Sequence, residues 1–205
     1  GSYRSFVTWL AERDLQAARA AWGEVLAGFD APTLVGPSDR LGLGRRGVAS
    51  VRVSEQTTQA VAELARSRHT TVNTVLQGAF AQLLMWLTGQ HDVAFGTVVS
   101  GRPTEVIGAE SMVGLMINTV PVRARFTGAT TVADLLEQLH SVQNHTLEHH
   151  HLALPEIHRV TGHDQLFDTL FVYENYPIDT VELSGEHELA ITEFTIHESA
   201  HYPLV

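Results

Sequence analysis

The sequence predicts an α/β fold in which helices and strands are interspersed, and three observations lead to that class. Apolar residues recur near the 3.6-residue helical period in several segments, β-rich runs lie between those segments, and no internal repeat is present. No linker is rich enough in Gly, Pro or Ser to divide the 205 residues, of which 44% are hydrophobic. We therefore expect one α/β domain or subdomain with one core of ordinary size.

The N-terminal part of the chain is expected to start with one amphipathic helix over residues 6–26. Phe6, Leu10 and Trp22 fall near its apolar stripe, and the helix should end near Gly28. The next residues, 28–47, contain two prolines and further glycines without periodicity, which indicates a long surface connection.

A short strand and two helices are expected to follow. Val48–Val53 is β-rich, and Ser54 after it is a good N-cap for a helix that runs to about Arg68. Residues 73–87 are apolar nearly all round, which predicts a helix buried on most of its surface and stopped by Gly89.

The second half of the chain alternates strands with helices. The run 117–126 alternates apolar and polar residues, and Pro121 within it indicates an edge strand or a bulge. Thr131 with Asp134 three residues later should open a helix that reaches about His149. The other expected elements are strands over 93–99, 169–173 and 189–197 and a short helix from Pro155 to about Val160.

The composition excludes several classes of function. Thirteen basic against twenty-three acidic residues give a formal charge of −10, which would repel the phosphates of a nucleic acid. The absence of cysteine excludes disulfides, thiolate metal sites and a cysteine nucleophile. No apolar run approaches the roughly 20 residues that span a bilayer, so we expect no membrane association and a cytoplasmic location.

A group of histidines is the most conspicuous cluster of potential metal ligands. His145 and His149 are spaced i, i+4 as in helical zinc sites, with His140 before them and His150 and His151 after them. The glutamate that zinc proteases place after the first histidine is replaced by Thr146, and no third ligand is evident. The pattern favours a polar helix end stabilised by the helix dipole, and we expect no metal.

Four motifs, in order, resemble those of the condensation domains of nonribosomal peptide synthetases. Tyr3, Phe6 and Trp9 resemble a Y-x-D-Y-x-x-W motif, with Ser5 in place of the usual Asp. The most specific match is 113–123 (VGLMINTVPVR), which resembles I-G-x-F-x-N-T-x-x-x-R and follows FGTVVSGR at 95–102. Two later stretches, 150–157 (HHLALPEI) and 198–204 (ESAHYPL), are similar to the family's last motifs.

The resemblance implies one lobe of the chloramphenicol-acetyltransferase-like (CoA-dependent acyltransferase) fold, a mixed β-sheet flanked by helices. In that family a catalytic H-H-x-x-x-D-G motif lies upstream of the Tyr3 motif. Neither His149-His150 nor His150-His151 fits it, because Leu154 or Pro155 stands where the Asp should be. We therefore expect Gly1-Ser2 to be a tag scar. Residues 3–205 would be the C-terminal subdomain, lacking the catalytic N-terminal lobe and a final strand and helix.

The function implied by the resemblance is amide-bond formation by the acceptor-side lobe of an acyltransferase-type domain, with this piece inactive alone. The substrates would be aminoacyl or peptidyl groups tethered to the phosphopantetheine arms of carrier domains, and no cofactor would be bound directly. The expected partners are carrier domains, the N-terminal lobe of the same domain and a neighbouring adenylation domain. Two alternatives remain open: a non-catalytic condensation-like module that recruits tailoring enzymes, and an epimerisation domain.

The resemblance assigns hypothetical roles to four residues, none of them catalytic. Asn118 can donate and accept hydrogen bonds at once, which suits a channel for an amide-bearing pantetheine arm; the alternative is that Asn118 ties strand to loop. Ser100 and Tyr173 would also line the channel, and Ser100 lacks the G-x-S-x-G context of a hydrolase nucleophile. Arg102 would form an inter-lobe salt bridge with the missing Asp. An isolated lobe should expose an apolar inter-lobe face and self-associate through it.

Overall fold

Three strands form the centre of the protein in a computed structural model that describes residues 2–36, 47–174 and 201–205. The long strands β1 (Asp92–Ser100) and β2 (Ile117–Arg125) are antiparallel along their whole length, and the short β3 (Leu170–Phe171) pairs with β1 in parallel. The order β2-β1-β3 makes this a mixed sheet, as the resemblance implied. Pro121 lies in β2 at the edge of this sheet, as predicted, where a residue without an N–H is tolerated.

The N-terminal region contains two helices where the sequence analysis predicted one. α1 (Tyr3–Ala11) ends before Asp14, and α2 (Leu15–Val25) starts after it. The Asp14 carboxylate accepts hydrogen bonds from the backbone N–H groups of Gln16 and Ala17, both at 2.9 Å. The prediction of a single helix was wrong because the N-cap of Asp14 starts a new helix within an otherwise continuous apolar periodicity.

Residues 47–54 do not form a strand, so the prediction of a short strand over Val48–Val53 was wrong. The segment has no strand pairing, and Val48 and Val51 are 95% and 87% exposed. A β-rich composition alone does not make a strand, because the backbone needs a neighbouring edge to pair with. The helix expected after it is confirmed: α3 (Glu55–Ser67) starts at Ser54, whose hydroxyl accepts from the N–H of Thr57.

The longest helix, α4 (Val72–Thr88), ends at the left-handed Gly89 as predicted. Its burial differs from the expectation of a helix covered on most sides. Leu83 is 40% exposed, Trp86 70% and Leu87 59%, so one apolar stripe of α4 faces outward. Among the described residues, no helix has the length and apolar character needed to cross a membrane.

The C-terminal part of the described chain supplies two helices and a short 3-10 turn. α5 (Val132–Thr146) begins with a capping box of Thr131 and Asp134 and stops at Thr146, three residues earlier than predicted. A 3-10 turn, η2 (Leu147–His149), follows, and α6 (Leu154–Thr161) has Pro155 in its first turn. The strand predicted over 169–173 is confirmed only as β3, and the one predicted over 189–197 lies outside the described residues.

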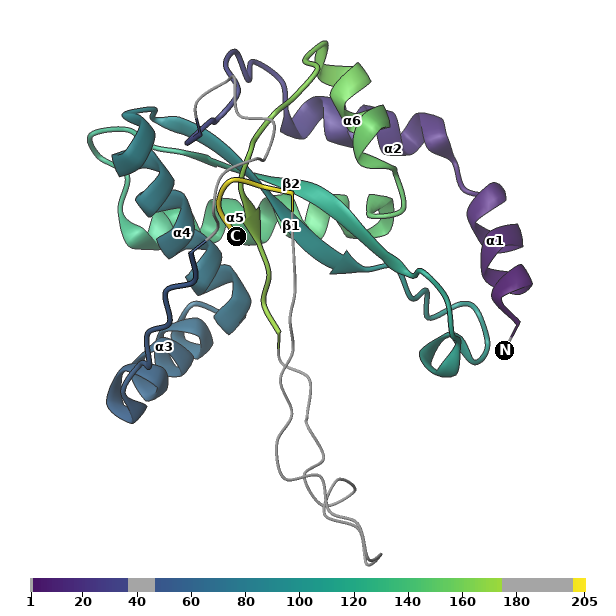
Figure 1. Ribbon diagram of the computed structural model, residues 1–205, viewed down its shortest axis with the longest axis horizontal. Helices are drawn as coiled ribbons and strands as arrows, with labels where there is room; N and C mark the ends of the chain where they lie inside the picture. Colours follow the sequence, from purple (N-terminus) through teal and green to yellow (C-terminus); the bar gives the residue numbers. More distant parts are fainter. Residues whose placement is uncertain (1, 37–46, 175–200) are drawn as a thin grey trace, which may run out of the picture.

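The helices lie on both sides of the β1–β2 hairpin and at its ends (Figure 1). One buried cluster joins α2 and α6 to the hairpin through Trp22, Leu152 and Val120, and a second joins α4 and α5 to it through Leu84 and Leu139. The rings of Phe80, Phe95 and Phe171 meet at centroid distances of 5.0 to 6.1 Å and connect α4, β1 and β3. The connection between β1 and β2 and the helix α1 lie together at the far end of the hairpin (Figure 1).

Candidate functional site

The first two sequence motifs meet in space at the connection between β1 and β2. The Tyr3 hydroxyl donates to the carbonyl of Leu115 at 3.1 Å, across 112 residues of sequence. A Cβ on Gly114 would lie 2.3 Å from the Tyr3 ring, and the φ of Gly114 is +156°. Glycine is required there because the aromatic ring lies directly against the backbone.

A small apolar cluster fixes this contact. Phe6 is buried with Ala109, Met112 and Met116, and Trp9 packs on the same cluster. The Phe6 and Trp9 rings stack with centroids 6.0 Å apart. The motif residues of α1 therefore serve to hold the 101–116 connection in place.

Arg102 lies within this connection and its guanidinium is bonded inside it. Its Nη1 donates to the carbonyl of Ala109 and lies 3.0 Å from the carbonyl oxygen of Met112. The sequence analysis assigned this side chain to an inter-lobe salt bridge with an Asp that the chain does not contain. The side chain is exposed, yet the loop's own carbonyls hold it, because a guanidinium offers five donors that backbone oxygens can accept.

Asn118 connects β2 to the turn between η2 and α6. Its Nδ2 donates to the carbonyls of His150 and Leu152, each at 2.8 Å, and its Oδ1 accepts from the N–H of Thr119 at 2.9 Å. Both amide hydrogens of Asn118 are thus engaged by backbone. This arrangement matches the strand-to-loop tie that the sequence analysis kept as the alternative to a channel role.

Ser100 is the last residue of β1 and is exposed, and Tyr173 is exposed as well. Val99 is directly opposite Asn118 in the ladder, and Ser100 is directly opposite Ile117. Because side chains alternate across a strand, Ser100 and Asn118 leave opposite faces of the hairpin. Tyr173, 39% exposed, lies two residues beyond β3. The structure therefore does not bring the three predicted channel residues into one cluster.

Arg123, the last residue of the most specific motif, is a buried clamp. Its Nε and Nη2 donate to the two oxygens of Asp92 at 2.8 and 2.6 Å. Its Nη1 donates to the carbonyls of Val25 and Ala27 at the C-terminal end of α2, at 3.0 and 2.8 Å. One guanidinium, 5% exposed, thus joins the open end of the hairpin to α2.

The histidines around the C-terminal end of α5 lie on two different elements. His145 lies in α5 and is 3.2 Å from Glu24, while His149 lies in η2, so the two do not share one helix. In residues 2–36, 47–174 and 201–205, no group of three or more His, Asp or Glu side chains is arranged to hold a metal ion. The reading of these residues as a helix end is consistent with this geometry.

His150 is the most perturbed ionisable group of the cluster. Burial is the main cause that lowers the pKa of His150 from 6.5 to about 4, and the neighbouring His149 and His151 lower it further. Its ring stacks on Trp22 at 6.5 Å, and its carbonyl is one of the two that Asn118 holds. Trp22 itself donates to the carbonyl of His149 at 3.1 Å.

Two further tethers were missed by the sequence analysis. The buried Asp168 accepts from the backbone N–H groups of Val35 and Gly36, so it holds the chain that follows α2. Gln77, 4% exposed on α4, reaches Thr97 of β1. Buried carboxyl and amide groups inside apolar surroundings were the available signal, but their partners are mainly backbone groups that the sequence does not distinguish.

The family of the chain is shown by a family-model match. The model of the condensation domain matches residues 1–205. The chondramide synthase of Chondromyces crocatus is 40% identical over 210 residues, which cover 99% of this chain and 5% of the relative. Surfactin synthase subunit 3 of Bacillus subtilis is 34% identical, with 98% and 16% covered. The chain thus spans a small part of the length of the curated relatives it matches.

Solved structures show the same fold. The first condensation domain of the CDA synthetase has a TM-score of 0.64 at 19% identity, with 78% of this chain and 35% of that chain covered. The X-domain from teicoplanin biosynthesis has a TM-score of 0.65 at 21% identity, with 78% and 37% covered. With its family-model match, its hairpin motif and this fold, the chain belongs to the condensation-domain family of nonribosomal peptide synthetases.

Proposed function

We propose that this chain is the acceptor-side lobe of a condensation domain that joins two carrier-tethered substrates by an amide bond. The observation that carries the proposal is the family-model match over residues 1–205, in a chain that covers only 35% to 39% of several solved condensation-domain chains. A single lobe of a two-lobe domain would match the family model along its whole length and still cover well under half of a complete domain. The domain boundaries of residues 3–205 expected from the sequence are part of this proposal.

The reaction is the attack of an acceptor amine on a donor thioester. A C–N bond forms, the C–S bond to the donor phosphopantetheine breaks, and the amine proton is transferred to the leaving thiolate. The chemistry requires two tethered arms to meet at a fixed geometry with a group that handles this proton. The chain contains no H-H-x-x-x-D-G sequence, so we assign the proton-handling histidine to polypeptide outside these 205 residues.

The role of this lobe in the reaction would be to supply a rigid wall of the passage. Asn118 supports this role as a positioning residue, since its Nδ2 holds the η2–α6 turn against β2 through two carbonyls. Ser100 at the end of β1 and Tyr173 beyond β3 are exposed, so a pantetheine arm could contact them. In the complete domain, Arg102 would give up contacts with the carbonyls of its own loop and form a salt bridge with the Asp of the catalytic motif of the other lobe.

The test compares the 205-residue chain with the intact synthetase. Both are mixed with donor and acceptor carrier domains loaded with aminoacyl groups, and the dipeptidyl product is measured by mass spectrometry. We expect product from the intact synthetase and none from the 205-residue chain. Turnover by the 205-residue chain would overturn the lobe assignment.

A second experiment tests whether the exposed residues of this lobe contact the acceptor substrate. In the intact synthetase, Tyr173→Ala and Ser100→Ala should raise the KM for loaded acceptor carrier more than they lower kcat. Glu63→Gln on α3, exposed and remote from the hairpin, is the matched control (Figure 1). If both variants behave like the control, the passage does not run along these strand ends.

A further inference from the structure

The helix α4 is the one α-helix of the described chain that contains no charged residue. Each of the other five described α-helices contains at least one Arg, Asp or Glu. A helix at the surface of a protein normally carries charged or polar residues on the side that faces water. The outer side of α4 therefore has the composition of a surface that another part of a protein covers.

The outer side of α4 is an apolar stripe formed by Leu83, Trp86 and Leu87, which we call the α4 stripe. These residues are exposed and are spaced i, i+3 and i+4, so they lie on one side of the helix. The neighbouring helix α3 packs on the other half of α4, where Val75 belongs to a buried cluster with Ala65. Within the described part of the chain, the α4 stripe thus remains uncovered.

The α4 stripe is remote from the residues that we assign to the passage. It lies in the last turns of α4, shortly before β1 begins at Asp92, whereas Ser100 and the 101–116 connection lie at the other end of β1 (Figure 1). The nine residues of this extended strand separate its two ends by roughly 25–30 Å. The α4 stripe and the passage are therefore separate surfaces.

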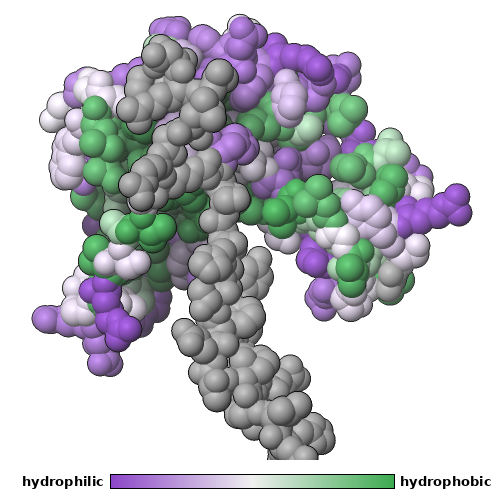
Figure 2. All heavy atoms as spheres, in the orientation of Figure 1, coloured by the Kyte–Doolittle hydropathy of each residue, from purple (hydrophilic) through white to green (hydrophobic). Residues whose placement is uncertain are grey.

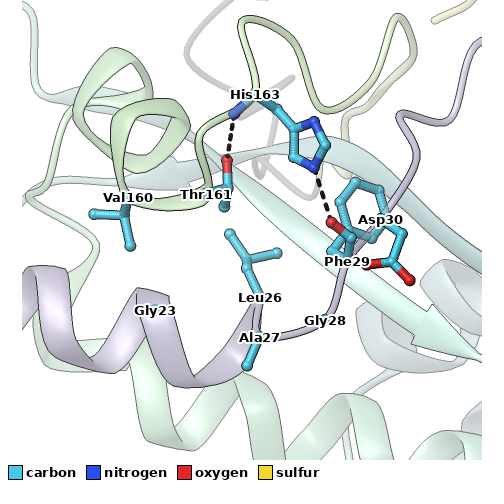
Figure 3. A pocket seen from close by; sticks show the side chains of 9 residues that line it. All are labelled: Gly23, Leu26, Ala27, Gly28, Phe29, Asp30, Val160, Thr161 and His163. Atoms are coloured by element: carbon cyan, nitrogen blue, oxygen red, sulfur yellow. Dashed lines mark hydrogen bonds between the residues drawn. The ribbon is translucent and has the colours of Figure 1, made fainter.

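The cavity at the ends of α2 and α6 is a poorer surface for a partner (Figure 3). It measures about 360 Å³, and none of the residues that line it has a large, exposed apolar side chain. Backbone carbonyls beside it already have donors within the chain. Arg123 Nη1 donates to the carbonyl of Ala27 at 2.8 Å, and His163 Nε2 lies 2.9 Å from the carbonyl oxygen of Phe29. Neither its polar groups nor its lining calls for a partner.

The size of the α4 stripe indicates what kind of partner it fits. Its three side chains expose roughly 350 Å² in total, which is the size of the largest apolar patch on a typical monomer. A stable complex between two free proteins buries about 800 Å² on each side, which is more than the stripe offers to a free protein or to a second copy. A contact between domains of one chain can be smaller, about 300 Å² on each side, because the tether keeps the effective concentration high.

We propose that the α4 stripe is the docking surface for a neighbouring folded domain of the same polypeptide. The two curated relatives described above have room for such a domain, since this chain covers only 5% and 16% of their length. The domain presents an apolar surface to Trp86, because a charged group would lose its hydration there and find no partner on α4. The proposal rests on the family membership and not on the proposed catalytic role.

The experiment places a photocrosslinker, p-benzoylphenylalanine (Bpa), in the α4 stripe of the intact synthetase. Leu87→Bpa is compared with Glu63→Bpa, at an exposed position of α3 outside the stripe. Equal amounts of ¹⁴N-labelled and ¹⁵N-labelled synthetase are mixed, irradiated and digested, and cross-linked peptides are identified by mass spectrometry. We expect Leu87→Bpa to cross-link to one region outside the 205 residues, with both peptides of each pair carrying the same nitrogen isotope.

A second variant tests the apolar character of the contact. Trp86→Arg places a charge in the α4 stripe and should lower the yield of the Leu87→Bpa cross-link at least about threefold. Gln59→Arg makes the same change of charge at an exposed position of α3 and should leave the yield unchanged. The helix content of the Trp86→Arg chain should match that of the unaltered chain in circular dichroism, because Trp86 is exposed and arginine is a good helix former.

Several outcomes contradict the proposal. Cross-linked pairs of mixed isotope would assign the α4 stripe to a second copy. Cross-links within the 205 residues, or to the lobe that carries the H-H-x-x-x-D-G motif, would assign it to the same domain. A Leu87→Bpa yield no higher than that of Glu63→Bpa, or equal yields with Trp86→Arg and Gln59→Arg, would show that no partner covers the stripe. These readouts do not depend on amide formation, so they fail separately from the proposed function.

Discussion

Acid should destabilise this protein through His150, and the structure gives the size of the effect. Burial keeps the His150 imidazole neutral in the folded state, with a pKa of about 4 against 6.5 for an unperturbed histidine. The unfolded chain therefore binds this proton more tightly than the folded chain. The stability contributed by neutral His150 is complete above about pH 6.5 and is lost as the pH falls toward 4.

The magnitude follows from the shift of about 2.5 pKa units at about 1.4 kcal/mol per unit, which gives a total of about 3 kcal/mol. Between pH 7 and pH 5, about 2 kcal/mol of this should be lost from the free energy of unfolding. His150→Gln removes the titrating group but keeps a polar side chain beside Trp22. His91→Gln, at an exposed histidine, is the control.

The assay is urea unfolding at pH 7 and pH 5, followed by tryptophan fluorescence, for the three proteins. The free energy of unfolding of His150→Gln should fall less between the two pH values, by about 2 kcal/mol, than those of the unaltered chain and His91→Gln. An equal loss for His150→Gln and the unaltered chain would refute the assignment of this proton to His150.

Three other predictions concern the clamps and the exposed apolar surface. Asn118→Ala should lower the free energy of unfolding by about 2 kcal/mol, because it removes two hydrogen bonds to backbone carbonyls; a loss near zero in urea unfolding would contradict the tie. Arg123→Met should cost about 3 kcal/mol, since it leaves Asp92 and two carbonyls without their donor, and an Asp92→Asn, Arg123→Met double variant should not add the two single losses. The chain should self-associate in light scattering, and Trp86→Gln, on the exposed stripe of α4, should reduce the apparent mass; a strict monomer at high concentration would exclude this.

Exposed apolar residues gather in two places that support the last of these predictions. Figure 2 shows apolar surface over the helices at the left and over the end of the hairpin at the right. The exposed apolar residues of the described chain include Leu83, Trp86 and Leu87 of α4, and Val113 and Leu115 of the connection between β1 and β2, which are 93% and 72% exposed. The apolar face expected of an isolated lobe is consistent with these positions.

The elements that the sequence predicted correctly are those with local signals. Ser54, the capping box at Thr131 and the left-handed Gly89 act within one turn of chain, and the structure confirms the helix ends they mark. The single N-terminal helix was wrongly predicted although its local signal, the N-cap of Asp14, was present. The failed strand prediction depends on remote groups. Residues 48–53 have strand composition, but a strand is defined by its neighbour, and composition does not reveal whether one is present.

The candidate site, like the fold, was only partly predictable from the sequence. The motif containing Asn118 and Arg123 was recognisable, whereas the backbone carbonyls that both side chains hold belong to the turn between η2 and α6 and to the end of α2. Every residue carries such a carbonyl, so the sequence offers no signal for the choice. The lowered pKa of His150 could not be predicted from the sequence either, because the burial of its side chain depends on how Trp22 and the hairpin pack around the turn.

The contact between Tyr3 and Gly114 couples the start of the chain to a loop more than one hundred residues later. The Tyr3 ring occupies the space that a Cβ at Gly114 would need, and Phe6 of the same helix is buried against the same connection. The first helix and the 101–116 connection should therefore open as one cooperative unit, and their amide protons should exchange with solvent at matching rates. Trimming the first few residues would then loosen a loop that lies nowhere near them in the sequence.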